Sequence, residues 1–305
     1  MAPPLLLLVV FLLPALAAGH QHPSSYGSSA LSEWRNAKSS YFAADPGDAI
    51  GGACGFGDLG KHGYGMATVG LSTALFERGA ACGGCYEVKC VEDLKYCLPG
   101  TSIVVTATNF CPPNYGFPAD AGGVCNPPNH HFLLPIQAFE KIALWKAGVM
   151  PIQYRRRKAP MSLLMQHRAI DYLEYHMLDL RDLINYSCTV LQFGSVFASY
   201  SLVVKCLREG GVRFSVSGKS FFFTVLISNV GGAGDVRSVK IKGTESGWLD
   251  MGRNWGQIWH INLDLTGQPV SFELTSSDGT TMTNFNVVPK DWEFGKTYTG
   301  KQFLL

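Results

Sequence analysis

Two adjacent histidines are the first residues of this chain that could carry chemistry. They lie in the stretch NPPNHHFLLPIQAF, residues 126–139. Histidine can act as a general base or bind a metal ion at neutral pH. His130 and His131 would point to opposite faces of a strand, so a metal site would need ligands from elsewhere in the fold. We therefore expect a solvated or hydrogen-bonded pair and no metal or other cofactor.

Acidic residues of the first half offer a second chemistry, the cleavage of glycosidic bonds by paired carboxyl groups. Nothing in their spacing selects a pair. The candidates are Asp45, Asp48, Asp58, Glu77, Glu87 and Asp120. Nucleophilic catalysis is not indicated either, because no serine lies in a nucleophile-elbow pattern.

Nine cysteines indicate an oxidising compartment. The cluster Cys82, Cys85, Cys90 and Cys97 could bind zinc or form a thioredoxin-like site. It lacks, however, the paired Cys-x-x-Cys arrangement of zinc ribbons and a flanking βαβ pattern. Disulfides are the expected state, and the odd number leaves at least one cysteine unpaired.

The beginning of the chain predicts secretion. Residues 1–19 are largely apolar, and a small-residue pattern, Ala15-Leu16-Ala17, precedes their end, which is typical of a cleaved signal peptide. An uncleaved anchor, which would associate the protein with the membrane at the wall, is the alternative. The formal net charge is +2, and basic residues are scattered apart from the run 155–158, so a nucleic-acid partner is not expected.

The elements that must position these residues are mostly strands. Glycine-rich turns and short β-branched runs from about residue 32 to 152 predict a compact β-barrel with long loops. A short amphipathic helix is expected over 134–146. From about residue 204 to 305, apolar and polar residues alternate in runs separated by turns, which predicts an antiparallel sandwich.

Three tryptophans in this second half could bind a sugar chain, because flat aromatic rings stack on the apolar faces of sugars. Trp248 stands in ESGWLDM, and Trp255 and Trp259 stand in RNWGQIWH. A spacing of four on one strand would place Trp255 and Trp259 on the same face. The alternative is that one or more of them fill the core.

Seven motifs together give the chain a family resemblance. It strongly resembles the plant α-expansins in GGACGFGDLGKHGYG (51–65), LSTALFERG (71–79), CGGCYEVKC (82–90), TATNFCPPN (106–114), NPPNHHF (126–132), SNVGGAGDV (228–236) and RNWGQIW (253–259). The resemblance implies an all-β protein: a six-stranded double-psi β-barrel over 30–156, related to one family of endoglucanases, and an immunoglobulin-like β-sandwich over 204–305 that binds cellulose.

The resemblance also implies a function. Family members are secreted to the cell wall and loosen it without hydrolysis, by disrupting noncovalent contacts between cellulose and matrix glycans such as xyloglucan. The expected partners are these polysaccharides, and a monomer with no protein partner is expected. Two alternatives remain open: a cellulose-binding wall protein without loosening activity, and a glycoside hydrolase that uses an unexpected acid.

Two departures from the family pattern fall at the expected site. The family has His-Phe-Asp where this chain has His131-Phe132-Leu133, so the position of the related endoglucanases' catalytic acid carries no carboxyl group. The family's Thr-Phe-Tyr corresponds to Ser40-Tyr41-Phe42, which keeps a hydroxyl and loses a phenol. By position, the polysaccharide-binding candidates are Ser40, Phe42, Asp45, Thr108, Asn109 and His131 in the barrel, with Phe221, Trp248, Trp255 and Trp259 in the sandwich.

The resemblance implies four disulfides and one foreign segment. The implied pairs are Cys54–Cys82, Cys85–Cys206, Cys90–Cys97 and Cys111–Cys125, which leave Cys188 unpaired. Family members run directly from Tyr-Arg-Arg to Val-x-Cys, so residues 157–203 are an insertion here. Its composition differs from the flanks, with a helical repeat of apolar residues and one sequon. Our hypothesis is a retained intron or another gene-model error.

Overall fold

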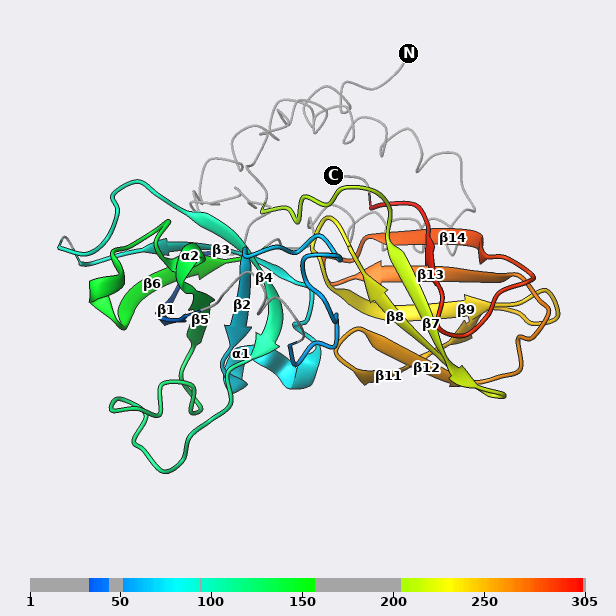
Figure 1. Ribbon diagram of the computed structural model, residues 1–305, viewed down its shortest axis with the longest axis horizontal. Helices are drawn as coiled ribbons and strands as arrows, with labels where there is room; N and C mark the ends of the chain where they lie inside the picture. Colours follow the sequence, from blue (N-terminus) through cyan, green and yellow to red (C-terminus); the bar gives the residue numbers. More distant parts are fainter. Residues whose placement is uncertain (1–32, 44–51, 94, 157–203, 304–305) are drawn as a thin grey trace, which may run out of the picture.

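The computed structural model describes residues 33–43, 52–93, 95–156 and 204–303, which form two bodies side by side (Figure 1). The first runs from blue to green in the figure and the second from yellow-green to red. Three predicted features lie outside the described residues: the signal peptide over 1–19, Asp45, and the insertion over 157–203, which contains Cys188. No helix of the described ranges is long and apolar enough to span a membrane.

Six strands close into the first body, a barrel with the order β1-β5-β2-β4-β3-β6. They are β1 (Arg35–Phe42), β2 (Thr68–Leu71), β3 (Cys85–Cys90), β4 (Ile103–Phe110), β5 (His131–Pro135) and β6 (Met150–Arg155). β1 pairs with β5 and β2 pairs with β4 in parallel, whereas the other pairs are antiparallel. Inward side chains such as Phe132, Ile152 and Val105 fill the barrel. The predicted six-stranded barrel is confirmed.

Short helical turns join some of these strands. They are α1 (Thr73–Phe76), the 3-10 turn η2 (Glu77–Gly79), α2 (Ile136–Phe139) and the 3-10 turn η3 (Trp145–Ala147). The helix expected over 134–146 is therefore a single turn, because Leu134 and Pro135 belong to β5 and their backbone is extended. Ala138 and Phe139 of α2 are buried in the barrel core.

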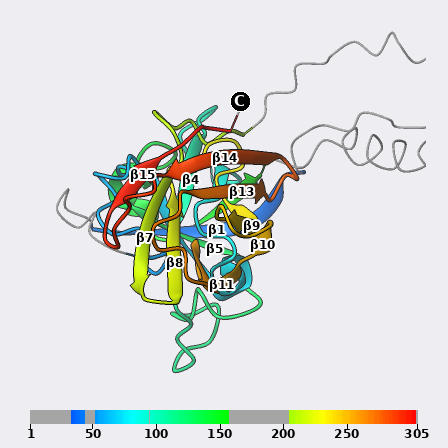
Figure 2. The same ribbon diagram turned by 90° about the vertical axis from the view of Figure 1, so that its right-hand side faces the viewer.

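Two antiparallel sheets form the second body. One has the order β10-β9-β13-β14, and the other has the order β11-β12-β8-β7-β15 (Figure 2). The strands are β7 (Arg213–Lys219), β8 (Phe222–Ser228), β9 (Val236–Lys242), β10 (Leu249–Asp250), β11 (Gly252–Trp255), β12 (Ile258–Asn262), β13 (Val270–Ser276), β14 (Thr281–Val288) and β15 (Thr297–Thr299).

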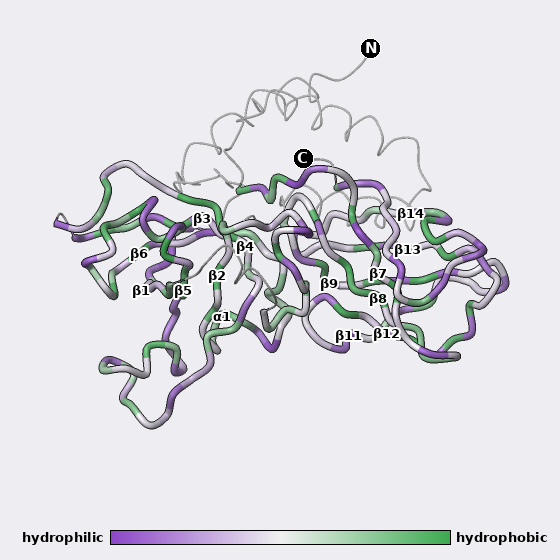
Figure 3. The backbone as a smooth tube through the Cα atoms, viewed as in Figure 1, coloured by the Kyte–Doolittle hydropathy of each residue, from purple (hydrophilic) through white to green (hydrophobic). Residues whose placement is uncertain are grey.

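Alternating side chains make the core between these sheets, as the sequence predicts. Phe214 of β7 stacks on Phe272 of β13 with ring centroids 4.9 Å apart, which joins the two sheets at their centre. Figure 3 shows hydrophobic stretches recurring along the strands of both bodies. The second body is thus the predicted sandwich.

Four disulfides cross-link the described residues: Cys54–Cys82, Cys85–Cys206, Cys90–Cys97 and Cys111–Cys125. These are the pairs that the family resemblance implies. Cys85–Cys206 links the barrel to the sandwich, and Cys111–Cys125 closes the loop that leads from β4 to β5. This loop extends below the barrel in Figures 1 and 2.

The barrel and the sandwich also meet through polar contacts. The Arg156 guanidinium lies 2.7 Å from the Asp235 carboxylate, and both side chains are largely buried. Gln257 donates to the carbonyl of Cys82, and Arg208 donates to the hydroxyl of Thr106. Charged and amide groups buried in this way need fixed partners, so these contacts set the two bodies in one relative position.

Candidate functional site

Three strands of the barrel carry the predicted groove residues that the structure describes: β1 has Ser40 and Phe42, β5 has His131, and β4 has Thr108 and Asn109. Ser40 of β1 lies opposite Leu133 of β5, and Gly70 of β2 lies opposite Leu133 on the other side. Alternation along β1 places Asn36, Lys38, Ser40 and Phe42 on one face, while Ser39 is buried. Phe42 is 38% exposed at the end of this row. The outer face of β1 and β5 is therefore the candidate groove, with Leu133 at its centre.

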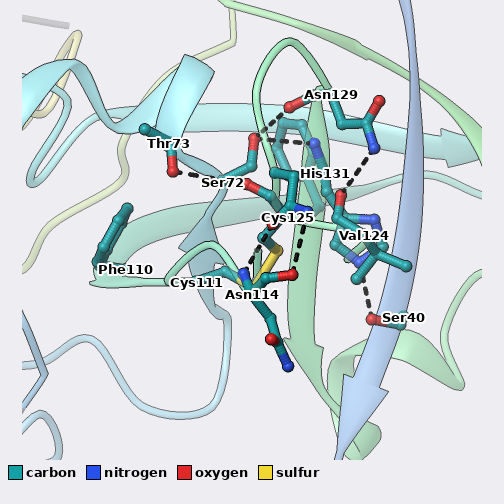
Figure 4. Close-up of a disulfide and its surroundings, with 12 residues drawn as sticks. Ser40, Ser72, Thr73, Phe110, Cys111, Asn114, Val124, Cys125, Asn129 and His131 are labelled. Carbon is teal, nitrogen blue, oxygen red and sulfur yellow. Dashed lines mark hydrogen bonds between the residues drawn. A yellow bond between two sulfur atoms is a disulfide. The ribbon is translucent and has the colours of Figure 1, made fainter. Parts of the chain in front are cut away.

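His131, two residues before Leu133 and opposite Lys38, belongs to the same face, where it is buried and forms a hydrogen-bond network (Figure 4). Its Nε2 is 2.7 Å from the Ser40 hydroxyl. Its backbone N–H donates to the Ser72 hydroxyl, which in turn donates to the carbonyl of Asn129. The side chain of His131 is fully buried, so the expectation that it contacts a polysaccharide directly is wrong. The ring instead fixes the position of the Ser40 hydroxyl through their hydrogen bond.

Burial keeps the His131 ring neutral. Desolvation, together with the nearby Lys38 ammonium, lowers the pKa of His131 to about 4. Nδ1 of this ring is buried without a hydrogen-bond partner among the described residues. A neutral ring fits this site because an imidazolium would place a second N–H, and a charge, in an unsatisfied environment.

The β4 candidates differ in their access to solvent. Thr108 is buried, and its carbonyl accepts a hydrogen bond from the N–H of Cys54. Asn109 is exposed, and its Oδ1 accepts hydrogen bonds from the N–H groups of Ala53 and Phe110. The Asn109 amide nitrogen is the part of this side chain that could reach a sugar hydroxyl.

Two of the barrel carboxylates that the sequence offered for acid-base chemistry, Asp58 and Glu87, have other contacts. Asp58 accepts the backbone N–H of Lys61, which lowers the pKa of the Asp58 carboxyl. Glu87 forms an ion pair with Arg155 at 2.7 Å. A raised pKa, which a general acid needs, is found at Asp235, whose carboxyl is buried between barrel and sandwich against Arg156. Asp235 is therefore a structural residue of the junction.

The outer face of the sheet β11-β12-β8-β7-β15 presents aromatic side chains. Phe221 in the β7–β8 turn is 64% exposed and Phe222 is 45% exposed. The Phe222 ring lies 5.9 Å from the His260 ring of β12. Trp255, 44% exposed, lies opposite Ile258 at the other end of β12, roughly 13 Å along the strand from the partner of Phe222. This face can stack on a flat sugar surface.

Trp255 also joins this face to the barrel. Its indole N–H donates to the carbonyl of Ala53, and its ring lies 5.8 Å from Phe76 of α1. Phe76 lies 4.8 Å from Phe110, the residue after Asn109 at the end of β4. Three rings therefore cross the junction between the barrel and the aromatic face of the sandwich.

Comparison with known proteins assigns the chain to a family. The model described as Expansin C-terminal domain matches residues 212–289, and the one described as Lytic transglycolase matches residues 68–154. Expansin-A10 of Oryza sativa subsp. japonica is 74% identical over 302 residues, 99% of this chain and 99% of its own. The chain belongs to the plant α-expansins.

Other relatives agree with this assignment. Expansin-A13 of Arabidopsis thaliana is 54% identical over 281 residues, which are 92% of this chain and 88% of its own. The crystal structure of an apo expansin from Clavibacter michiganensis is 14% identical, covers 90% of this chain and 99% of its own, and superposes with a TM-score of 0.56. A mutant of that expansin in complex with cellohexaose gives a TM-score of 0.55 at 15% identity. These two structures show the same fold.

Two of the predicted expansin aromatics are not on the aromatic face. Trp259 is buried in the sandwich core, with the Arg253 guanidinium 4.3 Å from its ring centroid, so the expectation that it stacks on sugar is wrong. Gly256, at φ +54°, turns the chain between β11 and β12, so Trp255 and Trp259 are not on one strand. Trp248 precedes β10, in the opposite sheet, where it contacts Phe285.

Sequence reasoning missed some residues of this expansin surface. Phe222 escaped notice although its signal was present: in the run 221–223, a period of two places Phe222 outward when Phe223 is in the core. His260 follows from the same alternation along β12. Within the described ranges, no three His, Cys, Asp or Glu side chains gather in a way that could hold a metal ion.

Proposed function

We propose that this protein is secreted to the plant cell wall and loosens it without hydrolysis, by disrupting noncovalent contacts between cellulose and matrix glycans. One observation carries the proposal: an exposed aromatic face on the sandwich adjoins a barrel groove in which a leucine, Leu133, stands at the acid position. Stacking on a sugar surface needs only the aromatic face. Hydrolysis would need two carboxyl groups in the groove.

Membership in the expansins supports cellulose as a partner. A bacterial expansin with the same fold has been crystallised with cellohexaose, an oligosaccharide of the cellulose type. In the chain described here, Phe221, Phe222 and Trp255 offer the flat apolar contacts that such a ligand uses. Xyloglucan is the matrix glycan that we assign by family resemblance, and we expect the protein to act as a monomer.

Constant-load extension of heat-inactivated plant walls tests the proposal. The full secreted chain should extend the walls and should release no new reducing ends from cellulose or xyloglucan. Leu133→Asp restores the family's carboxyl group between Ser40 and Gly70. Leu144→Asp, on an exposed leucine between α2 and η3 and outside the strands of this face, is the matched control.

The second candidate is a cellulose-binding wall protein that has lost loosening activity together with the family's carboxyl group, which Leu133 replaces. If the unmodified chain does not extend walls and Leu133→Asp does, this second function is correct. Extension by the unmodified chain and by both variants alike would mean that loosening needs no carboxyl group at this position. Release of reducing ends by the unmodified chain would contradict both candidates.

A further inference from the structure

Trp255 receives little support from its own sheet. It is the last residue of β11, the edge strand of this sheet, which pairs with β12 alone among the described strands. A register shift falls between Arg253 and Trp255, and Gly256 turns the chain directly afterwards at φ +54°. A bulge re-aims the side chain beside it, and an edge strand has a partner on one side only. The direction of the Trp255 ring is therefore set by contacts outside the sheet.

The barrel supplies these contacts. The Trp255 indole N–H donates to the carbonyl of Ala53, and the ring lies against the ring of Phe76. Gly79 approaches closely, since a Cβ there would lie 2.9 Å from the backbone nitrogen of Gly256 and 3.8 Å from Cδ2 of Trp255. The rest of the ring remains exposed. The barrel thus fixes the orientation in which the sandwich presents this ring.

Ala53 is held in turn by Asn109. Its N–H donates to Oδ1 of Asn109 at 2.9 Å, while its carbonyl accepts the indole N–H of Trp255. The next residue, Cys54, donates its N–H to the carbonyl of Thr108, and a disulfide anchors it to the barrel. The two backbone groups of residue 53 therefore connect a side chain of the barrel to an aromatic ring of the sandwich.

The two ends of the Asn109 side chain have different surroundings. Oδ1 accepts two backbone N–H groups, from Ala53 and from Phe110 at 2.8 Å, which occupies both of its lone pairs. Nδ2 has no hydrogen-bond partner among the described residues, and Asn109 is exposed. The oxygen is thus committed to the backbone, and the nitrogen is the end that could bond to a ligand. Substitutions can separate these two roles.

We propose that Asn109 is a positioning residue for the aromatic face: by accepting the N–H of Ala53, it fixes the carbonyl that orients the Trp255 ring. A ring that stacks on a rigid surface binds best when it is already held in the bound orientation, and hydrogen bonds from supporting residues provide this. Asn109 acts on a ligand through Trp255, from the other body of the molecule. The inference goes beyond the proposed function, and only its adsorption measurement rests on that function.

The indole N–H of Trp255 gives a test that needs no ligand. In a nitrogen–proton correlation spectrum of the full chain, the indole signal that disappears in Trp255→Phe belongs to Trp255. Asn109→Ala should speed the exchange of this proton with water by about threefold to tenfold, the factor that one hydrogen bond typically contributes. Asn109→Asp keeps an acceptor oxygen and should retain the slow exchange.

Asn114→Ala is the matched control for both measurements. Asn114 is also an exposed asparagine of the barrel whose Oδ1 accepts a backbone N–H, that of Gly116, but this bond lies in the β4–β5 loop and has no connection to Trp255. The exchange of the Trp255 indole proton and the adsorption of the protein should both be the same in this variant as in the unmodified chain.

Adsorption to microcrystalline cellulose tests the consequence for binding. Asn109→Ala should weaken adsorption by about threefold to tenfold. Asn109→Asp should adsorb like the unmodified chain, because it loses the amide nitrogen but keeps the acceptor. In a Trp255→Phe background, which lacks the indole N–H, Asn109→Ala should have no further effect, since both changes break one connection.

Three results would overturn the proposal. The first is equal indole exchange in Asn109→Ala and the unmodified chain. The second is an Asn109→Asp variant that adsorbs as weakly as Asn109→Ala, which would assign the effect to direct contact by the amide nitrogen. The third is a further loss of adsorption when Asn109→Ala is added to Trp255→Phe. No adsorption by the unmodified chain would instead contradict the cellulose partner of the proposed function, and the indole measurement would still decide the role of Asn109.

Discussion

His131 shows how a single buried ring can make the stability of the barrel depend on pH. Its folded-state pKa of about 4 is below the ordinary value of 6.5, so between these values the unfolded chain binds more protons than the folded one. The contribution of His131 to the free energy of unfolding is fully present above pH 6.5 and is lost as the pH falls toward 4. A pKa lowered this far corresponds to about 3 kcal/mol of stability, as an order of magnitude.

His131→Gln isolates this contribution. Urea unfolding of the unmodified chain and of the variant should show that only the former loses about 3 kcal/mol through His131 between pH 6.5 and about 4. The variant should also be less stable at every pH above this window, because the Ser40 hydroxyl loses its hydrogen bond to Nε2 of the ring. A pH dependence that is the same in both proteins would show that His131 is not the titrating group.

Phe222 and Phe285 give a matched pair for testing which sheet binds cellulose. Both rings are exposed, but Phe222 belongs to the sheet with Trp255 and Phe285 to the sheet with Trp248. Phe222→Ala should weaken adsorption to cellulose severalfold, because aromatic contacts contribute about 0.5–1.5 kcal/mol beyond the area they bury. Phe285→Ala should leave the adsorption isotherm unchanged. The reverse pattern would move the cellulose site to the opposite sheet.

At the scale of elements, the β4–β5 loop depends on one buried amide. Asn126→Ala removes three hydrogen bonds to the loop backbone, and each group left unsatisfied costs about 1–3 kcal/mol. We expect this variant to be cleaved faster by chymotrypsin at the exposed Tyr115 and Phe117, while Cys111–Cys125 keeps the fragments joined. Asn114→Ala keeps the Asn126 contacts, which use the Asn114 backbone, and is the control. Equal cleavage rates would show that the disulfide alone orders the loop.

The elements also show where sequence reasoning succeeds and where it stops. Alternation in runs such as VRFSV predicts β7 because both its period and its turn signals are local. The structure of RNWGQIW depends on distant parts of the chain. Gly256 adopts a positive φ, so the chain turns there. Trp259 then packs in the sandwich core, while the indole N–H of Trp255 donates to a carbonyl of the barrel. Pattern alone also cannot show that His131 is buried, since its cover comes from distant Ser40 and Ser72.

At the scale of the whole molecule, the two bodies are fastened where the insertion begins and ends. Arg156, the last described residue before it, is paired with Asp235 of the sandwich, and any side chain at Gly84 would collide with the Arg156 guanidinium. Cys206, soon after it, is bonded to Cys85 and donates from its N–H to the carbonyl of Gly232. Both flanks therefore contact the same two segments, residues 84–85 and 232–235.

This arrangement predicts that the chain can be joined directly from Arg156 to Val204. Long connections change the free energy of folding by only a few kcal/mol, so the shortened protein should unfold at the same or a slightly higher denaturant concentration. It should also keep Cys85–Cys206, adsorb to cellulose as before, and extend walls to the same degree. Mass spectrometry of the naturally secreted protein and sequencing of its transcript across codons 150–210 test the origin of the segment. A transcript with every codon of 157–203, together with a shortened protein that fails to fold, would establish the insertion as a functional part of this expansin.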